Sequence, residues 1–279
     1  MRQLTAVLAA VLLVVTGCST GQTSGRVQVV AAAYPFAWLA EQVGGPDVSV
    51  TNLVKPGAEP HDIELSPRQV ILVKSARLVV YLHGFQAAVD DALEGGPQGL
   101  DLGHVVQLHG NDPHIWLDPV RMEQAATALG DRLARVDPAH AAGYRSRAAA
   151  VVSKLGELDD AFRTALRSCA RHDIVTSHSA FGYLAPRYGL VQHGISGLTP
   201  DAEPSPAKIA EIADYARTHG VTTIFFESLV DPKVAKTVAS EIGATTAVLD
   251  PIEGVVKGDD YLTVQLRNAT ALRRALGCE

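Results

Sequence analysis

A long helical stretch with a series of short apolar segments on either side of it constrains the fold more than any other feature of the chain. Residues 138–168 contain a proline only at the start, many alanines, and apolar residues that recur every three or four positions. This pattern predicts one uninterrupted helix of about 30 residues, roughly 45 Å long. A helix of that length would connect two lobes rigidly and restrict them to small tilts.

The segments on either side of this helix alternate between strand-like and helix-like patterns. Apolar runs rich in valine, leucine and threonine lie at 27–33, 48–54 and 78–82, and again at 173–177, 190–195, 222–227 and 245–249. Helical periodicity lies between them at 36–43, 67–75, 206–219, 232–242 and 260–276. Such alternation predicts the α/β class, with two doubly wound lobes of parallel-type sheets. We expect an N-terminal lobe at 26–137, the linking helix at 138–168 and a C-terminal lobe at 169–279.

The first residues of the chain have the features of an export signal. Arg2 precedes an apolar run at residues 4–15, which is shorter than the roughly 20 residues that a membrane-spanning helix needs. We therefore expect a cleaved signal peptide over residues 1–17. The small residues before Cys18 resemble a bacterial lipobox, which leaves a lipid-bearing cysteine as the new N-terminus. The alternative is an ordinary signal peptide with an incidental cysteine.

Residues 18–25 are small and polar after the cysteine, which favours a lipidated flexible tether. The mature protein is then expected outside the cytoplasm, anchored to the outer face of the cytoplasmic membrane or periplasmic. In such an oxidising compartment, Cys169 and Cys278 are expected to form a disulfide. The alternative, metal binding by either thiol, is weak because both lie far in sequence from the histidine motifs described below.

The charge pattern argues against a nucleic-acid partner. The net charge is −6, and the lysines and arginines are scattered rather than clustered. We therefore exclude nucleic-acid binding.

Three histidines lie in segments that follow predicted strands or rigid turns. They are His61 in GAEPHDIELSP, His114 in NDPHIWLDP and His178 in TSHSAFGYL, and Asp250 ends the strand-like run at 245–249. Ligands in open α/β sheets gather at the carboxyl ends of strands. Three imidazoles and one carboxylate suit a tetrahedral zinc-type centre, which we therefore predict at His61, His114, His178 and Asp250.

The chain has ten histidines, so some of them can lie near a strand end by chance and have no role in metal binding. We interpret four as structural from their contexts: His140, His172, His193 and His219. His83, His104 and His109 are harder to dismiss. Because His104 and His109 precede His114 on the same loop, they are candidates for auxiliary ligands that pass metal to the main site.

The motifs GAEPHDIELSP, NDPHIWLDP, VTSHSAFGYLAPRYGL, FFESLVDPK and LDPIEG, in that order, resemble the zinc and manganese solute-binding lipoproteins of bacterial ABC importers (cluster A-I). The resemblance covers nearly the whole mature chain. It implies that His61, His114, His178 and Asp250 match the metal ligands of the family. Glu227 matches another motif position, which we interpret as supporting rather than ligating, and Glu59 is a candidate outer partner of His61.

The resemblance also bears on the metal. Manganese-associated members tend to carry glutamate where this chain has His178, so the chain resembles the zinc-type members, and imidazole itself favours Zn²⁺ over Mn²⁺. Many zinc members have a long loop rich in histidine and acidic residues before the second ligand. The corresponding stretch here, residues 92–113, is short, which argues against a strong second zinc site.

These features predict an extracytoplasmic protein, not an enzyme, that captures Zn²⁺ in a cleft between two lobes and delivers it to an ABC permease. Its expected contacts are the permease, the membrane through lipid on Cys18 and a metallochaperone, and we expect a monomer. Metal affinity should fall as the pH drops through the histidine range of about 6.5. The alternatives are a manganese-binding homologue, a surface adhesin with a bound metal, and a zinc hydrolase that uses Glu227 as general base.

Overall fold

The computed structural model describes residues 25–96, 99–200, 204–229, 231–254 and 258–279. The predicted signal peptide, Cys18 and the tether up to residue 24 lie outside the described residues. Within them, no helix combines the length and the apolar character that crossing a membrane requires.

The first half of the chain forms a parallel four-stranded sheet. Its strands are β1 (Val27–Ala31), β2 (Val48–Asn52), β3 (Leu78–Tyr81) and β4 (Gly99–Asp101), in the order β2-β1-β3-β4. Val29 pairs with Val50 on one side and with Leu78 on the other. The central strands β1 and β3 are almost fully buried, as expected for a parallel sheet covered on both faces.

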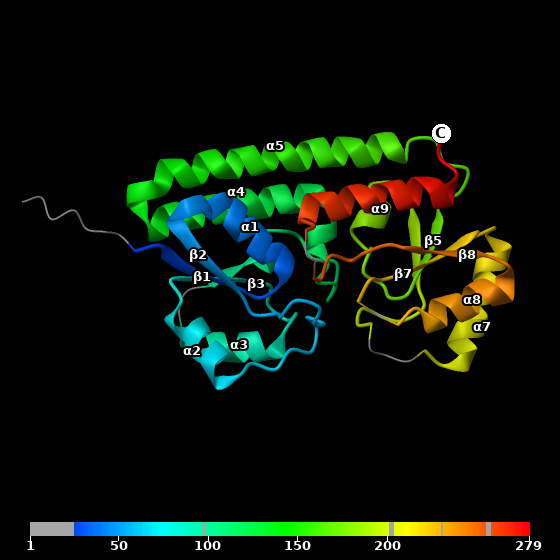
Figure 1. Cartoon of the computed structure of the whole chain (residues 1–279), viewed down its shortest axis with the longest axis horizontal. Coiled ribbons are helices and arrows are strands. Elements are labelled where there is room, and N and C mark those ends of the chain that lie inside the picture. Colours follow the sequence, from blue (N-terminus) through cyan, green and yellow to red (C-terminus); the bar gives the residue numbers. More distant parts are fainter. Residues whose placement is uncertain (1–24, 97–98, 201–203, 230, 255–257) are drawn as a thin grey trace, which may run out of the picture.

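The second half repeats this topology. Its strands are β5 (Asp173–Thr176), β6 (Val191–Gly194), β7 (Thr223–Phe226) and β8 (Thr245–Val248), in the order β6-β5-β7-β8, all parallel. Two parallel sheets with interspersed helices confirm the predicted α/β class (Figure 1).

Helices connect the strands of both sheets. They are α1 (Tyr34–Gly44), α2 (Pro67–Ser75) and α3 (Ala87–Leu93) in the first half, and α6 (Leu184–Arg187), α7 (Pro206–Thr218) and α8 (Lys233–Ile242) in the second. The start of α2 shows why a helix forms there. The Ser66 hydroxyl accepts from the backbone of Gln69, and the Gln69 side chain accepts from the backbone of Ser66, so two otherwise unpaired donors are satisfied.

The long helix α5 (Ala141–Ala165) runs along one side of the molecule past both sheets (Figure 1). It is slightly shorter than predicted, because a 3-10 turn at Pro138–His140 precedes it. This turn joins it to α4 (Pro119–Val136), which the sequence analysis did not predict. The two helices lie side by side, and a Cβ on Gly130 would come within 2.7 Å of the Ala148 Cβ. Glycine at position 130 therefore permits the close approach of α4 and α5.

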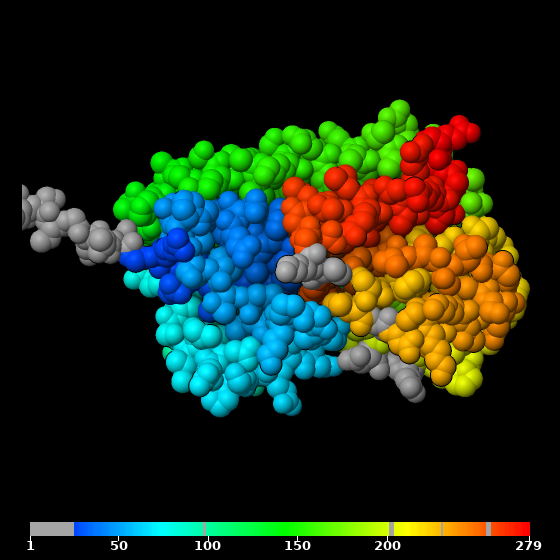
Figure 2. Space-filling view, viewed as in Figure 1, coloured from blue at the N-terminus to red at the C-terminus, as the bar shows by residue number. Residues whose placement is uncertain are grey.

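The C-terminal helix α9 (Tyr261–Leu276) packs against α5 and reaches the first half of the chain (Figure 2). The Tyr261 ring stacks on Trp38 of α1 at 4.5 Å between centroids, and its hydroxyl donates to the Trp116 carbonyl at 2.5 Å. Trp116 in turn donates from Nε1 to the Pro251 carbonyl at 2.7 Å. The two halves thus share a continuous buried core in addition to the α5 connection.

The predicted disulfide between Cys169 and Cys278 is confirmed. It ties the residue range just after α5 to the end of α9. Backbone hydrogen bonds reinforce this junction, since Arg171 donates to the Leu276 carbonyl and Glu279 donates to the Ser168 carbonyl.

Candidate metal centre

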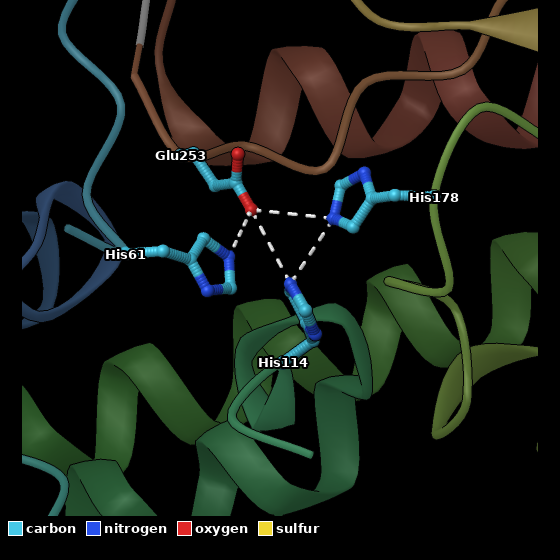
Figure 3. Close-up of side chains that lie close together, drawn as sticks. All are labelled: His61, His114, His178 and Glu253. Carbon is cyan, nitrogen blue, oxygen red and sulfur yellow. Dashed lines mark hydrogen bonds and ion pairs between the residues drawn. The ribbon is translucent and has the colours of Figure 1, made fainter. Parts of the chain in front are cut away.

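Four buried side chains converge between the two sheets: His61, His114, His178 and Glu253 (Figure 3). Each lies in a loop beyond the carboxyl end of a strand: β2, β4, β5 and β8, respectively. One potential ligand atom from each lies within 4.8 Å of all the others. Two of these side chains come from each half of the chain, so the group forms only when the halves are packed together.

The Glu253 carboxylate is at the centre of the group. Its Oε1 lies 3.1 Å from Nε2 of His61, 3.3 Å from Nε2 of His114 and 3.6 Å from Nε2 of His178. The Nε2 atoms of His114 and His178 are 3.3 Å apart. His61 is 8 % exposed and the other three are at most 1 % exposed, so the group is shielded from water.

Carboxylates fix the orientation of two of the rings. Nδ1 of His114 lies 2.7 Å from Oδ1 of Asp112, and Nδ1 of His178 lies 2.6 Å from Oε1 of Glu227. A carboxylate is a hydrogen-bond acceptor and cannot donate. Of the two tautomers of a neutral imidazole, it therefore selects the one with the proton on Nδ1. The Nε2 atoms of both rings then point into the centre, where a neutral ring offers a lone pair.

Burial and charge act in opposite directions on His178. Burial alone would lower the pKa of its imidazole, but the hydrogen bonds and charges of Glu227 and Glu253 outweigh burial and raise the pKa to about 10. For Glu253, burial would raise the pKa of the carboxyl, and its hydrogen bonds to the three histidines hold that pKa well below the usual range instead. Without a cation, the group is therefore held together by a proton on His178 and the Glu253 carboxylate.

The structure brings together the three histidines of the predicted site, but it places Asp250 outside the group. Glu253 is the fourth member of the group, in the place where the sequence analysis expected Asp250. The Asp250 carboxylate instead accepts from the Ser228 hydroxyl and, at 2.7 Å, from the backbone N–H of Ile252. Asp250 lines a neighbouring cavity of about 600 Å³ together with Ser228 and Asn268.

The carboxylate that reaches the three histidines lies three residues after Asp250, at Glu253. Asn268 of α9 holds the start of this turn, because its side chain accepts from Asp250 N at 2.9 Å and donates to Asp250 O at 2.7 Å. Ile252 then adopts φ +60°, which is rare for a β-branched residue, with its side chain fully buried. This left-handed residue turns the backbone so that Glu253 points at the imidazoles (Figure 3).

The two predicted supporting residues lie beside the group. Glu227 accepts from His178 Nδ1 and from the Ser177 hydroxyl, in agreement with a supporting position. Glu59 accepts from the backbone N–H of His61 at 2.9 Å. The ring of Phe85 packs edge-on against His61, with 5.0 Å between centroids, and so limits rotation of that imidazole.

The two candidate auxiliary histidines lie away from the group. His104 is exposed and lies 2.8 Å from Asp101. Nε2 of His109 lies 3.2 Å from the guanidinium of Arg121, which can only donate, so this lone pair is engaged. Among the described residues, neither belongs to a group with metal-binding geometry.

The sequence of the chain is similar to a known family and to several of its members. Residues 29–275 match the family described as "ZnuA: Zinc-uptake complex component A periplasmic". The chain is similar to the high-affinity zinc uptake system protein ZnuA of Bacillus subtilis, with 32% identity over 97% of this chain and 96% of the relative. It is also similar to the zinc-binding protein AdcA of Streptococcus pyogenes, with 35% identity over 89% of this chain but only 56% of that longer relative.

Solved structures show the same likeness. The laminin-binding protein Lmb of Streptococcus agalactiae, described as a bifunctional protein with adhesin and metal transporting activity, superimposes with a TM-score of 0.85 at 32% identity. That match covers 90% of this chain and 99% of Lmb. The Zn(II)-bound ZnuA-like domain of Streptococcus pneumoniae AdcA matches with a TM-score of 0.80 at 33% identity, over 90% of this chain and 99% of the domain.

Proposed function

Because this chain belongs to the family of zinc-uptake complex component A (ZnuA) proteins, we propose that it captures Zn²⁺ outside the cytoplasm and passes it to an ABC permease. The metal would be held by Nε2 of His61, His114 and His178 and by the Glu253 carboxylate. This ligand set replaces the one predicted from sequence in its fourth member only.

The separations between the ligand atoms carry this proposal. A tetrahedral zinc ion with bonds of about 2.0–2.1 Å holds its ligand atoms about 3.3–3.4 Å apart. Four separations within the group are 3.1, 3.3, 3.3 and 3.6 Å. These four separations therefore already approach the distances that tetrahedral zinc requires, and all the ligand atoms lie within 4.8 Å of one another.

The donor set favours zinc over manganese. Three imidazole nitrogens and one carboxylate oxygen suit Zn²⁺, whereas Mn²⁺ prefers oxygen donors and a higher coordination number. His178 is the residue that makes the difference, since a carboxylate at this position would give a site with two oxygen donors. Two carboxylates outside the group, Asp112 and Glu227, further orient the imidazoles of His114 and His178 for a small tetrahedral ion.

The site is one of binding rather than catalysis. A hydrolytic zinc centre leaves one position open for water, whereas here Glu253 fills the fourth position and the group is almost fully buried. The zinc hydrolase alternative also required Glu227 as a general base, and Oε1 of Glu227 already accepts from His178 Nδ1 and from the Ser177 hydroxyl. The family, moreover, consists of zinc-uptake components and not of enzymes.

The cellular setting of the protein follows from the same proposal. Residues 1–17 would be removed, and lipid on Cys18 would anchor the mature chain, through the tether at 18–25, to the outer face of the cytoplasmic membrane. The relative AdcA of Streptococcus pneumoniae is named a zinc-binding lipoprotein, which supports this anchor. A monomer with lobes at 26–137 and 169–279 would present the loaded site to the permease, and a metallochaperone would be a further partner.

Metal analysis with competitive titration tests the proposal. Metal-free protein is titrated with Zn²⁺ and with Mn²⁺ against a chelating dye, as wild type, as His178→Ala and, as a control away from the site, as His219→Ala. We expect one tightly bound zinc per wild-type chain, a large loss of affinity only in His178→Ala, and no displacement of zinc by manganese. Manganese that displaces zinc, or a His178→Ala variant that binds like wild type, would contradict the proposal.

A second candidate function is surface adhesion, which the similarity to Lmb favours. Laminin is the probe that the name of this relative supplies. Adhesion by this chain predicts saturable binding of the purified protein to immobilised laminin, compared in zinc-loaded and metal-free form with bovine serum albumin as the control surface. Equal retention on laminin and albumin would rule this second function out.

A further inference from the structure

Tyr183, which comes from the second half of the chain, contacts the first-half loop that carries His114. Its hydroxyl accepts from the backbone N–H of His109 at 2.9 Å and donates to the carbonyl of Asp112 at 2.8 Å. One phenol oxygen thus bridges both ends of the turn at 109–112, which is itself closed by a hydrogen bond from Asp112 N to His109 O. Tyr183 is only 2 % exposed, so both hydrogen bonds are shielded from water.

Two side chains of the first half, which contact each other, pack on the Tyr183 ring. The His109 imidazole stacks on the ring with 4.5 Å between centroids, and the Arg121 guanidinium also lies 4.5 Å from the ring centre. Arg121 additionally donates to the carbonyl of Gln107 and contacts His109. The stacked imidazole, the guanidinium and the two hydrogen bonds of the hydroxyl together hold the phenol against the loop at 107–112.

Gly182 allows the second half to approach Asp112. A Cβ at position 182 would lie 2.4 Å from Oδ2 of Asp112, which is closer than real Cβ contacts come. The other oxygen of that carboxylate accepts from both the backbone N–H and the Nδ1–H of His114, at 3.0 and 2.7 Å. Residues 182–183 therefore contact the carbonyl and the carboxylate of the residue that orients the His114 ring.

We propose that Tyr183, together with Gly182, is a positioning residue for zinc binding: it fixes Asp112 from the opposite half of the chain and thereby aims Nε2 of His114 into the centre. Tyr183 does not touch the metal. Its effect passes through Asp112 to His114, so the packing of the two halves sets the geometry of a ligand. The inference rests on the proposed function, because it assumes that His114 binds zinc.

Zinc affinity of the full chain tests the proposal through Tyr183→Phe, which keeps the ring and removes both hydrogen bonds. Outer partners of zinc ligands typically contribute 10–100-fold in affinity, and we expect a loss of about tenfold. In an Asp112→Ala background the same change should cost less than about twofold, because the acceptor that links Asp112 to His114 is already absent. The visible spectrum of the Co²⁺-loaded protein should also shift, since it reports ligand geometry.

Tyr144→Phe is the matched control. Tyr144 is fully buried, and its hydroxyl donates to Asp137 at the turn before α5, away from the four metal-binding side chains. We expect its zinc affinity and Co²⁺ spectrum to equal those of wild type. Gly182→Ala provides a second variant that disturbs Asp112 from the other side, and we expect a loss at least as large as for Tyr183→Phe.

The outcomes separate this inference from the proposed function. A wild-type protein that binds no zinc would overturn both. A wild-type protein that binds zinc, with Tyr183→Phe and Gly182→Ala of unchanged affinity, would overturn this inference alone. Losses in Tyr183→Phe and Asp112→Ala that add in full would also overturn it, because they would show that Tyr183 does not act through Asp112.

Discussion

At the scale of single residues, His178 carries the proton that zinc would displace from the proposed site. Its ring lies between two carboxylates, Glu227 at Nδ1 and Glu253 near Nε2. These raise its pKa to about 10, so the metal-free imidazole is a cation at neutral pH. Zinc needs the Nε2 lone pair, and binding therefore releases this proton.

This protonation predicts proton release at a pH where ordinary histidines release none. At pH 8 an imidazole with a pKa of about 6.5 is already neutral, whereas His178 is still charged. We expect release of about one proton per zinc at pH 8, measured by calorimetry in buffers of different ionisation enthalpy. Affinity should then rise with pH up to about 10 and fall steadily below it, over a wider range than the sequence alone indicates.

Glu227→Gln is the companion variant, since it removes the carboxylate closest to His178 Nδ1. The pKa of His178 should fall, and fewer protons should be released at pH 8. Zinc binding to wild type without proton release at this pH would contradict the account.

The sequence allowed three of the four central residues to be predicted, and the fourth was missed for a physical reason. His61, His114 and His178 follow strand ends or proline turns, where side chains of parallel sheets meet. Asp250 also follows a strand end, but its carboxylate accepts a hydrogen bond from the backbone N–H of Ile252 and so does not reach the histidines. Glu253 is the other acidic residue of LDPIEG, so the sequence did contain this candidate. Only the path of the backbone decides which of the two carboxylates, Asp250 or Glu253, faces the histidines.

At the scale of elements, the turn after β8 stores backbone strain next to the site. A β-branched residue at φ +60° costs roughly 1–3 kcal/mol. The burial of the Ile252 side chain and the two hydrogen bonds between Asn268 and Asp250 offset this cost.

Helix α4 is an element whose start could be predicted from neighbouring residues alone. Asp118 caps its first turn by accepting from Val120 N, and Pro119 starts it, so this helix was predictable although it was not predicted.

The strain in the turn can be measured by comparing two small replacements. Ile252→Ala and Ile252→Gly both leave the side-chain cavity, but only glycine adopts φ +60° without cost. We expect the glycine variant to be more stable than the alanine variant by about 1 kcal/mol in free energy of unfolding. At an ordinary loop position the alanine variant is the more stable of the two. An alanine variant more stable than the glycine variant would therefore contradict backbone strain at position 252.

At the scale of the whole molecule, the connections that hold the two halves in one arrangement include helix α5, the core around Trp116 and Tyr261, and the group of three histidines and Glu253. The alternation of strands and helices allowed the two sheets and α5 to be predicted. It could not show that α9 returns to stack Tyr261 on Trp38, because that contact joins residues 223 positions apart (261 − 38). Such long-range packing depends on the complete fold rather than on local pattern.

The disulfide contributes to stability without contributing to the site. It closes a segment with a sequence separation of 109, and bridges of this kind typically stabilise by about 2–5 kcal/mol. We expect the double replacement Cys169→Ser, Cys278→Ser to lower the unfolding free energy of the metal-free protein by this amount. Zinc affinity of the folded variant should equal that of wild type, and a marked loss would show that the bridge also fixes the metal centre.

The central claim is that one zinc ion is held between the two sheets by His61, His114, His178 and Glu253. Competitive zinc titration of Glu253→Gln beside Asp250→Asn tests it most directly, because the two acids lie three residues apart and have different contacts. We expect a loss of more than about 100-fold for Glu253→Gln, and of no more than about tenfold for Asp250→Asn, which acts only through the turn. A larger loss in Asp250→Asn than in Glu253→Gln would contradict the account.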